Sequence, residues 1–308
     1  MQELTFSLDV SRKVWLERWG ARSINSLELA QKSLKYFDKY VKLLKVSEED
    51  LIRQLKKVSQ QPEFYQFLDN IVQFMVQNKL SPRTVRTYFM FVKSYLRSKG
   101  FRIYNEDIKQ FCKLPVIIKE TRIAVTMEDI AKLYNAAKPK MMAKLSFLVS
   151  SGARLGEVLQ LKHSDIRGNK VTIRAENTKT KAERITYISE QAKNDLAKYV
   201  KGKGQDAYVF VRKFAPAISV QQAEAEFSLI RDKCSLTKRY RLSRYHHVTI
   251  HRLRAFCKTM ASEVCGKDFA EGLVGHEGYL STYYALPETQ RYEKYKLLEP
   301  KLTIPVIR

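Results

Sequence analysis

Several short motifs in the second half of the chain carry basic and phenolic side chains that could act together. The motif "SGARLGEVL" places Arg154 three residues before Glu157, and "HRLR" places His251 three residues before Arg254. Residues three apart share one face of a helix. The candidate groups are Arg154, Glu157, Lys179, Lys181, His251, Arg254, His276, Tyr283 and Tyr284.

These residue types have one joint use, which is chemistry on a phosphodiester. Arginine binds the non-bridging oxygens with paired hydrogen bonds, and its charge matters more as the transition state gains negative charge. A tyrosine hydroxyl can attack phosphorus, and lysine or histidine can move the protons. Since no carboxylate cluster typical of a magnesium site accompanies them, we predict phosphoryl transfer on DNA with no metal and no cofactor. Each motif alone is a weak signal, because the chain has 17 tyrosines and a His-x-x-Arg pair is more often a surface pair.

Arg154 leaves two interpretations open. It can form a local ion pair with Glu157 that completes a helix end, or it can wait for an anion that is not part of the protein. The flanking runs are apolar, and the residues alone leave both interpretations open.

The composition of the chain favours a nucleic-acid partner. The 308 residues include 56 Lys+Arg and 32 Asp+Glu, a formal net charge of +24, and so large a surplus is typical of proteins that bind a polyanion. A basic solubilising surface is the alternative.

The four cysteines form no C-x-x-C pair, and the sequence shows neither a signal peptide nor an apolar run that could span a membrane. We therefore expect a cytoplasmic, nucleoid-associated protein without a zinc site or disulfides.

Helical patterns dominate residues 12–110. Ser81 is an expected helix N-cap, Pro82 the first helical residue, and Gly100 lies past the helix end. Residues 81–102 contain six basic side chains and no acidic one, which favours a face on the DNA backbone over an ordinary solvated face. Our DNA-binding candidates, here and further along the chain, are Arg83, Arg86, Lys93, Arg97, Lys119, Arg122, Lys238, Arg239, Arg241 and Arg244.

The remaining chain divides into a connector and a second domain. Residues 113–125 contain a proline and few helix signals, and Thr126 is an expected N-cap. Residues 168–189 alternate as a β-hairpin with a lysine-rich tip. Residues 231–254 hold eight Lys and Arg against one acid, and form either a DNA-facing surface or a solvated loop. We predict a mainly α fold with one small antiparallel sheet, in domains 1–112 and 126–308 joined by a basic linker.

The motifs, in this order, resemble those of the tyrosine recombinases, the integrase family. The resemblance covers about residues 20–300 and implies an N-terminal SAM-like helical core-binding domain that clamps DNA, followed by a catalytic domain. It implies Glu157 as a supporting acid and Lys179, in preference to Lys181, as the catalytic lysine. The catalytic residues that it implies are Arg154, Lys179, His251, Arg254, His276 and Tyr284.

The chain departs from the Xer type of this family at the nucleophile. That type places the tyrosine nine residues after the second histidine, where this chain has Ala285. The segment "STYYALPETQRYEKYK" is more similar to integrases of archaeal viruses and plasmids, in which the second residue of an aromatic pair attacks. We therefore expect Tyr284 to be the nucleophile and Tyr283 to be the next candidate.

The resemblance implies a site-specific recombinase that integrates a mobile element through a 3′-phosphotyrosyl bond. Its partners would be a double-stranded attachment site and further copies of itself, as a dimer or tetramer on DNA. A cellular Xer-like resolvase and a non-catalytic DNA-binding relative are the alternatives. Residues 288–308 offer apolar side chains that either fold back on their own domain or dock on a neighbouring protomer.

Overall fold

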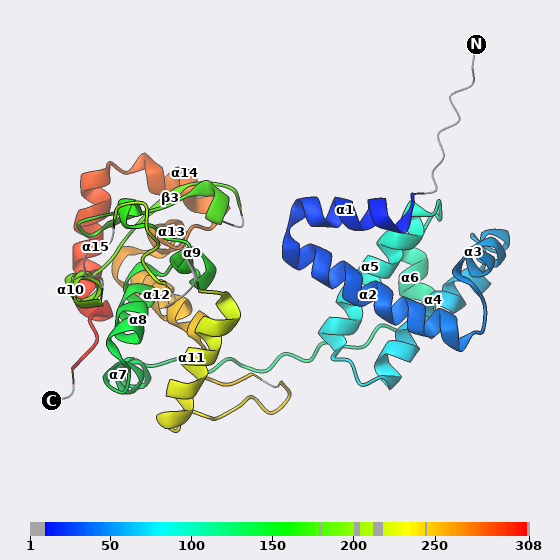
Figure 1. Cartoon of the computed structure of the whole chain (residues 1–308), viewed down its shortest axis with the longest axis horizontal. Coiled ribbons are helices and arrows are strands. Elements are labelled where there is room, and N and C mark those ends of the chain that lie inside the picture. Colours follow the sequence, from blue (N-terminus) through cyan, green and yellow to red (C-terminus); the bar gives the residue numbers. More distant parts are fainter. Residues whose placement is uncertain (1–9, 179, 200–203, 212–217, 244, 307–308) are drawn as a thin grey trace, which may run out of the picture. The chain divides into compact units, whose positions relative to one another are not determined.

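The chain forms two compact units, residues 1–119 and 120–308 (Figure 1). The structure, a computed structural model, describes residues 10–178, 180–199, 204–211, 218–243 and 245–306. The division between the units falls within the segment 113–125 that the sequence marks as a connector.

The described part of the first unit is helical. Its apolar stripe on α5, formed by Val85, Phe89, Val92 and Leu96, is buried in the core of the unit. Ser81 caps this helix by accepting a hydrogen bond from the Thr84 N–H, as the sequence predicts. The helices are α1 (Arg12–Arg22), α2 (Ile24–Leu43), α3 (Glu48–Lys57), α4 (Pro62–Gln77), α5 (Pro82–Ser98) and α6 (Asn105–Phe111).

The second unit combines helices with one small sheet. The predicted fold class, mainly α with one small antiparallel sheet, is confirmed, and the sheet has three strands in the order β1-β2-β3. Its elements up to the hairpin are α7 (Met127–Asn135), α8 (Pro139–Ser151), α9 (Leu155–Leu159), η1 (His163–Asp165), β1 (Ile166–Arg167), β2 (Lys170–Ile173), η2 (Ala175–Asn177) and β3 (Arg184–Tyr187). The helices that follow are α10 (Glu190–Tyr199), α11 (Val220–Lys233), α12 (Ile250–Cys265), α13 (Lys267–Leu273), α14 (Glu277–Ala285) and α15 (Glu288–Leu302). None of the helices in the described residues is long and apolar enough to cross a membrane.

The hairpin register decides which side chains enter the core. Ile173 lies opposite Arg184, and Val171 lies opposite Thr186. Residues directly opposite each other in antiparallel strands point to the same side of the sheet. Arg184 and Thr186 therefore share the buried face with two aliphatic residues, and both are buried.

Helix α8 delivers the chain to the arginine motif through a tight turn. It ends at Gly152, whose φ of +59° is a left-handed conformation that favours glycine. A Cβ at this position would lie 3.0 Å from Val274 and 3.1 Å from the Cys257 sulfur, so the turn is also closely packed. The turn brings the backbone against α12, which carries the His-x-x-Arg motif.

The C-terminal helix α15 packs on its own unit (Figure 1). Tyr295, Leu298, Leu302 and Ile304 are all buried in the core, and the Tyr295 hydroxyl donates to the Ser150 carbonyl at 3.1 Å. Of the two alternatives for this tail, the structure shows the fold-back. The apolar side chains that suggested docking on a neighbour are used inside the unit, and docking on another protomer bound to DNA stays a prediction.

Candidate active site

Arg154 and Glu157 form the local ion pair that one interpretation predicts. Arg154 is the N-cap of α9, and its backbone N–H donates to Glu157 Oε2 at 2.8 Å. Its Nη1 donates to Glu157 Oε1 at 2.9 Å. The Glu157 side chain is 2% exposed and that of Arg154 is 28% exposed, so the arginine still reaches solvent.

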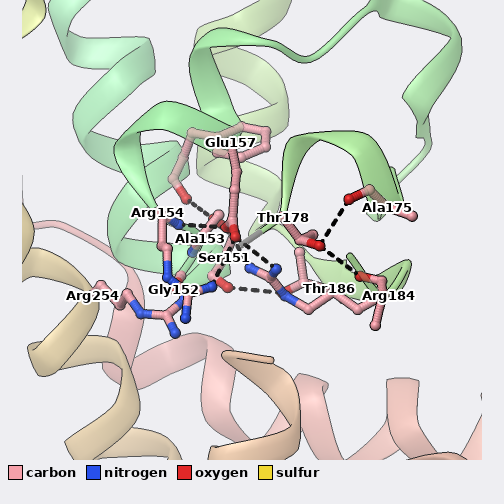
Figure 2. Close-up of polar contacts among 12 residues, drawn as sticks. Ser151, Gly152, Ala153, Arg154, Glu157, Ala175, Thr178, Arg184, Thr186 and Arg254 are labelled. Atoms are coloured by element: carbon pink, nitrogen blue, oxygen red, sulfur yellow. Dashed lines mark hydrogen bonds and ion pairs between the residues drawn. The ribbon is translucent and has the colours of Figure 1, made fainter. Parts of the chain in front are cut away.

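Arg184 is a functional candidate that the sequence reasoning missed. Its Nη1 and Nη2 donate to the two carboxylate oxygens of Glu157 at 3.0 and 2.6 Å, and both side chains are 2% exposed. Burial by itself raises the pKa of Glu157, but the hydrogen bonds and charges of Arg184 and Arg154 outweigh it and hold that pKa below its ordinary value. Figure 2 shows the two arginines approaching Glu157 from α9 and β3.

Arg254 lies beside this cluster, on the buried side of α12. Its Nη1 donates to the Gly152 carbonyl at 2.7 Å (Figure 2). Its Nη2 is buried and has no hydrogen-bond partner among the described residues. Burial, followed by the positive charges of Arg154 and Arg184, lowers the pKa of Arg254 to about 10. A buried, unpaired N–H donor next to two other arginines favours the entry of an anion.

His251 belongs to the same electrostatic environment. It stands on α12 three residues before Arg254, and its side chain is exposed. Neighbouring protein atoms displace water from the imidazole, which lowers its pKa. The positive charges of Arg254, Arg154 and Arg122 lower it further. His251 is therefore held neutral near pH 7, a form that can accept a proton or donate a hydrogen bond.

His276 is the N-cap of α14, and a carboxylate orients it. Its Nδ1 is hydrogen-bonded to Glu271 Oε2, and the Lys258 ammonium lies 2.6 Å from Glu271 Oε1. Gly275, the residue before His276, has a φ of +78°, and a Cβ there would lie 2.3 Å from Arg184 Cδ. The second histidine motif therefore packs directly against the Arg184–Glu157 pair.

The two tyrosines of α14 differ in access. Tyr283 is 1% exposed, and burial raises the pKa of its phenol well above the ordinary value. Tyr284 is 39% exposed, and its hydroxyl oxygen accepts the Ile185 N–H at 2.8 Å. Burial also raises the pKa of Tyr284, but this N–H and the charges of Arg291 and Arg184 act against the increase. Tyr284 is thus the accessible phenol of the pair.

The lysines of the hairpin tip are described only in part. Lys179 lies outside the described residues. Lys181 is exposed, has a φ of +56°, and donates to the Glu176 carbonyl at 3.3 Å. In the described part of the chain, no group of three or more His, Cys, Asp or Glu side chains could hold a metal ion.

The basic candidates on α5 lie at or near the surface of the first unit. Arg83, Arg86 and Arg97 are exposed, while Lys93 is half-buried with its ammonium 5.1 Å from the centre of the Phe89 ring. Arg86 and Arg97 also donate to backbone carbonyls, at 2.9 and 2.6 Å. These bonds fix the guanidinium groups in place and leave them accessible on one face of the helix.

The other basic candidates lie on the connector and between α11 and α12. Arg244 is outside the described residues, and the exposed ones are Lys119, Arg122, Lys238, Arg239 and Arg241. The segment is anchored by a β-bridge between Arg239 and His246 and by the Tyr240 hydroxyl, which accepts the Ile123 N–H at 3.0 Å. Where it is described, the segment is thus braced internally by the bridge and joined to the connector by Tyr240.

The chain is similar to known proteins in sequence and in fold. The sequence model of the phage integrase family matches residues 124–288, more than half of the chain. The tyrosine recombinase XerD of Rickettsia bellii is 29% identical over 144 residues, which are 42% of this chain and 47% of that protein. A probable integrase/recombinase protein of Methanocaldococcus jannaschii is 21% identical over 268 residues, 80% of this chain and 77% of that protein. The chain spans about half the length of the XerD relatives that it matches.

A solved structure of a lambda integrase dimer bound to a COC′ core site is similar to this chain. The TM-score is 0.62 at 16% identity, and the match covers 88% of this chain and 97% of that one. At this identity the likeness shows a shared fold.

Proposed function

The chain belongs to the phage integrase family, and from this premise we propose that it is a tyrosine site-specific recombinase. It would cut and rejoin double-stranded DNA through a 3′-phosphotyrosyl intermediate. The observation that carries the proposal is the buried Arg254 Nη2, which lacks a partner among the described residues and lies close to Arg154. A phosphate oxygen would satisfy it.

The reaction uses the groups of this site in defined roles. The Tyr284 oxygen attacks phosphorus and passes its proton to the neutral His251. The bond to the 5′ oxygen breaks, and that oxygen leaves with a proton from Lys179. Arg154 and Arg254 bind the non-bridging oxygens, on which charge accumulates. His251 and His276 supply further hydrogen bonds to the phosphate and to the reacting oxygens. Rejoining is the reverse attack by a 5′ hydroxyl on the phosphotyrosine, so the bond energy is kept within the protein–DNA adduct.

Glu157 supports this chemistry without touching the substrate. It holds Arg154 by two hydrogen bonds and is itself held by Arg184. Both interpretations of Arg154 therefore apply together. The ion pair fixes the guanidinium, and its exposed side faces the phosphate.

The DNA would be bound by basic surfaces on each of the two units. We assign contacts with the phosphate backbone to the candidate residues of α5, the connector and the segment before α12. Apart from the half-buried Lys93, those that the structure describes are exposed, and the segments are nearly free of acidic neighbours in sequence. The partner is then a double-stranded attachment site, bound by two or four copies of the chain inside the cell. A dimer on DNA is what the similar lambda integrase structure contains.

Within this class we propose integration of a mobile element of a virus or plasmid in an archaeon. The support is the resemblance of the segment around Tyr284 and the match over 80% of the chain to the probable integrase of Methanocaldococcus jannaschii. A cellular Xer-like resolvase is the second candidate, favoured by the similarity to XerD.

A nicked suicide substrate made from the DNA that flanks the gene tests the proposal. The nick releases the fragment that carries the 5′ hydroxyl, so rejoining fails and the adduct accumulates. We expect an adduct with the wild-type chain and with Tyr283→Phe, and none with Tyr284→Phe, which should bind the same DNA normally. Peptide mapping that finds the DNA on Tyr283 would contradict the assignment, and a wild-type chain that binds without an adduct would be the non-catalytic relative.

A further inference from the structure

Arg291 is a buried cation beside the tyrosine pair. It lies in the first turn of α15, and its side chain is 5% exposed. Its Nε and Nη1 are buried without a hydrogen-bond partner, and it forms no ion pair within 4.0 Å, among the described residues. The guanidinium carbon lies 4.7 Å from the centre of the Tyr284 ring and 5.1 Å from that of Tyr283.

This environment is unusual for an arginine. Burial of a charge is strongly unfavourable unless a counter-charge or hydrogen-bond acceptors compensate for it. Here two aromatic rings, through their interaction with the cation, and a hydrogen bond with Tyr187 provide the compensation, while Nε and Nη1 stay unpaired among the described residues. An apolar side chain would fill the same space without an unpaired charge, so packing of α15 against α14 does not by itself explain an arginine.

The phenol of Tyr284 experiences this charge directly. Burial raises the pKa of Tyr284. The Ile185 N–H lowers this pKa most, followed by the charge of Arg291 and then by the charge of Arg184. Glu183 acts in the opposite direction. The ionisable groups that face this phenol are Arg291 from α15, Tyr283 from α14, Tyr187 and Arg184 from β3, and Glu183 just before β3.

We propose that Arg291 is a positioning residue for the nucleophile, which holds the Tyr284 ring and uses its charge to favour the phenolate that attacks phosphorus. The inference rests on the proposed function in one respect, that Tyr284 is the nucleophile. It makes the first turn of the tail part of the reaction machinery. The attacking oxygen loses its proton as the bond to phosphorus forms, and a cation over the ring stabilises the charge that develops on it.

The experiment measures the phenol itself in the full-length protein. Incorporation of 3,5-difluorotyrosine at position 284 gives a fluorine NMR signal, and fluorination brings the titration into the range where the protein is folded. The variants are Arg291→Met, which removes the charge, and Arg291→Lys, which keeps it. Lys301→Met is the matched control, because it removes an exposed positive charge from the same helix. Thermal melting followed by circular dichroism establishes that each variant is folded, and Arg291→Gln replaces the methionine variant if that one is not.

We expect the titration midpoint to rise by about one pH unit in Arg291→Met, from the loss of one charge at this distance. It should stay near the wild-type value in Arg291→Lys and in the control. Adduct formation by the Arg291→Met chain that carries ordinary tyrosine should fall about tenfold at pH 7 and recover as the pH is raised. An unchanged midpoint, or equal shifts in the lysine and methionine variants, would show that Arg291 only packs the helix.

The titration needs no cleavage, so the two proposals fail separately. A wild-type chain that never forms an adduct removes the proposed function. A wild-type adduct combined with an unchanged midpoint removes only the role of Arg291.

Discussion

Replacement of Glu157 by glutamine should destabilise the second unit more than replacement of Arg184 by methionine. Both changes break the same buried ion pair, in which each side chain is 2% exposed. Removal of one partner of a buried pair costs about 3–5 kcal/mol, because the remaining charge stays buried without compensation. The two changes differ in what is left behind.

In Arg184→Met the carboxylate keeps both hydrogen bonds from Arg154, at 2.8 and 2.9 Å. We therefore expect the lower end of the range, about 3 kcal/mol. In Glu157→Gln, Arg184, Arg154 and Arg254 lose the carboxylate that they share, and their repulsion is no longer offset. We expect the upper end, about 5 kcal/mol.

The chain contains its own internal reference for this measurement. Both tryptophans, Trp15 and Trp19, lie in the first unit, so their fluorescence in urea reports the unfolding of that unit alone. Far-ultraviolet circular dichroism follows the helices of both units. We expect the mutations to move the second transition and to leave the tryptophan transition at its wild-type urea concentration.

The pH dependence gives an independent test with a definite sign. The pKa of Glu157 in the folded chain lies below its ordinary value of 4.5. The stability that it contributes is therefore present above pH 4.5 and is lost as the pH falls through the folded pKa. The difference in stability between the wild type and Glu157→Gln should shrink over that acid range. A constant difference from pH 7 down to pH 3, or equal losses in the two single variants, would refute the reasoning about charge.

The remaining predictions concern single groups of the site and the tail. Arg154→Lys should lower the rate of adduct formation by several orders of magnitude, because lysine cannot form the paired hydrogen bonds to the phosphate. Its affinity for DNA in a gel shift should change little, and adduct formation near the wild-type rate would contradict this. A substrate with sulfur at the 5′ bridging position should rescue Lys179→Ala, since a thiolate leaves without a proton, and rescue of Lys181→Ala instead would reverse the choice of lysine. Truncation after Pro287 should unfold the second unit, because each large core side chain removed costs about 2–5 kcal/mol. Circular dichroism checks this, and a truncated chain that loses only the helical signal of α15 would contradict it.

The sequence was a good guide where the pattern is local. The cap at Ser81 and the apolar stripe of α5 depend only on residues a few positions apart, and both are confirmed. The arginine and histidine motifs also lie on the helices expected of them. Helix periodicity and capping are properties of short segments, so one sequence contains enough information to predict them.

Arg184 was missed because its role depends on distant contacts. In sequence it is one basic residue among several in a hairpin, and its partner Glu157 lies 27 positions away. The available signal was the strand register, which places Arg184 opposite the buried Ile173. Register follows from the turn and the packing of the whole hairpin, which the alternation of apolar residues alone does not determine. The tail was undecided for the same reason, since Tyr295 finds its acceptor 145 positions away, at Ser150.

The charge of the assembled cluster explains why one acid and several arginines occur together. Glu157 compensates one of three neighbouring guanidinium groups, those of Arg154, Arg184 and Arg254, so two positive charges remain. In the reaction that we propose, a phosphodiester would bring one negative charge, and its phosphorane-like transition state would carry about two. The residual charge thus matches the transition state better than the bound substrate, and only such a difference accelerates the chemical step. A second acid in the cluster would leave one positive charge, which matches the single negative charge of the bound substrate. The preference for the transition state would then be lost.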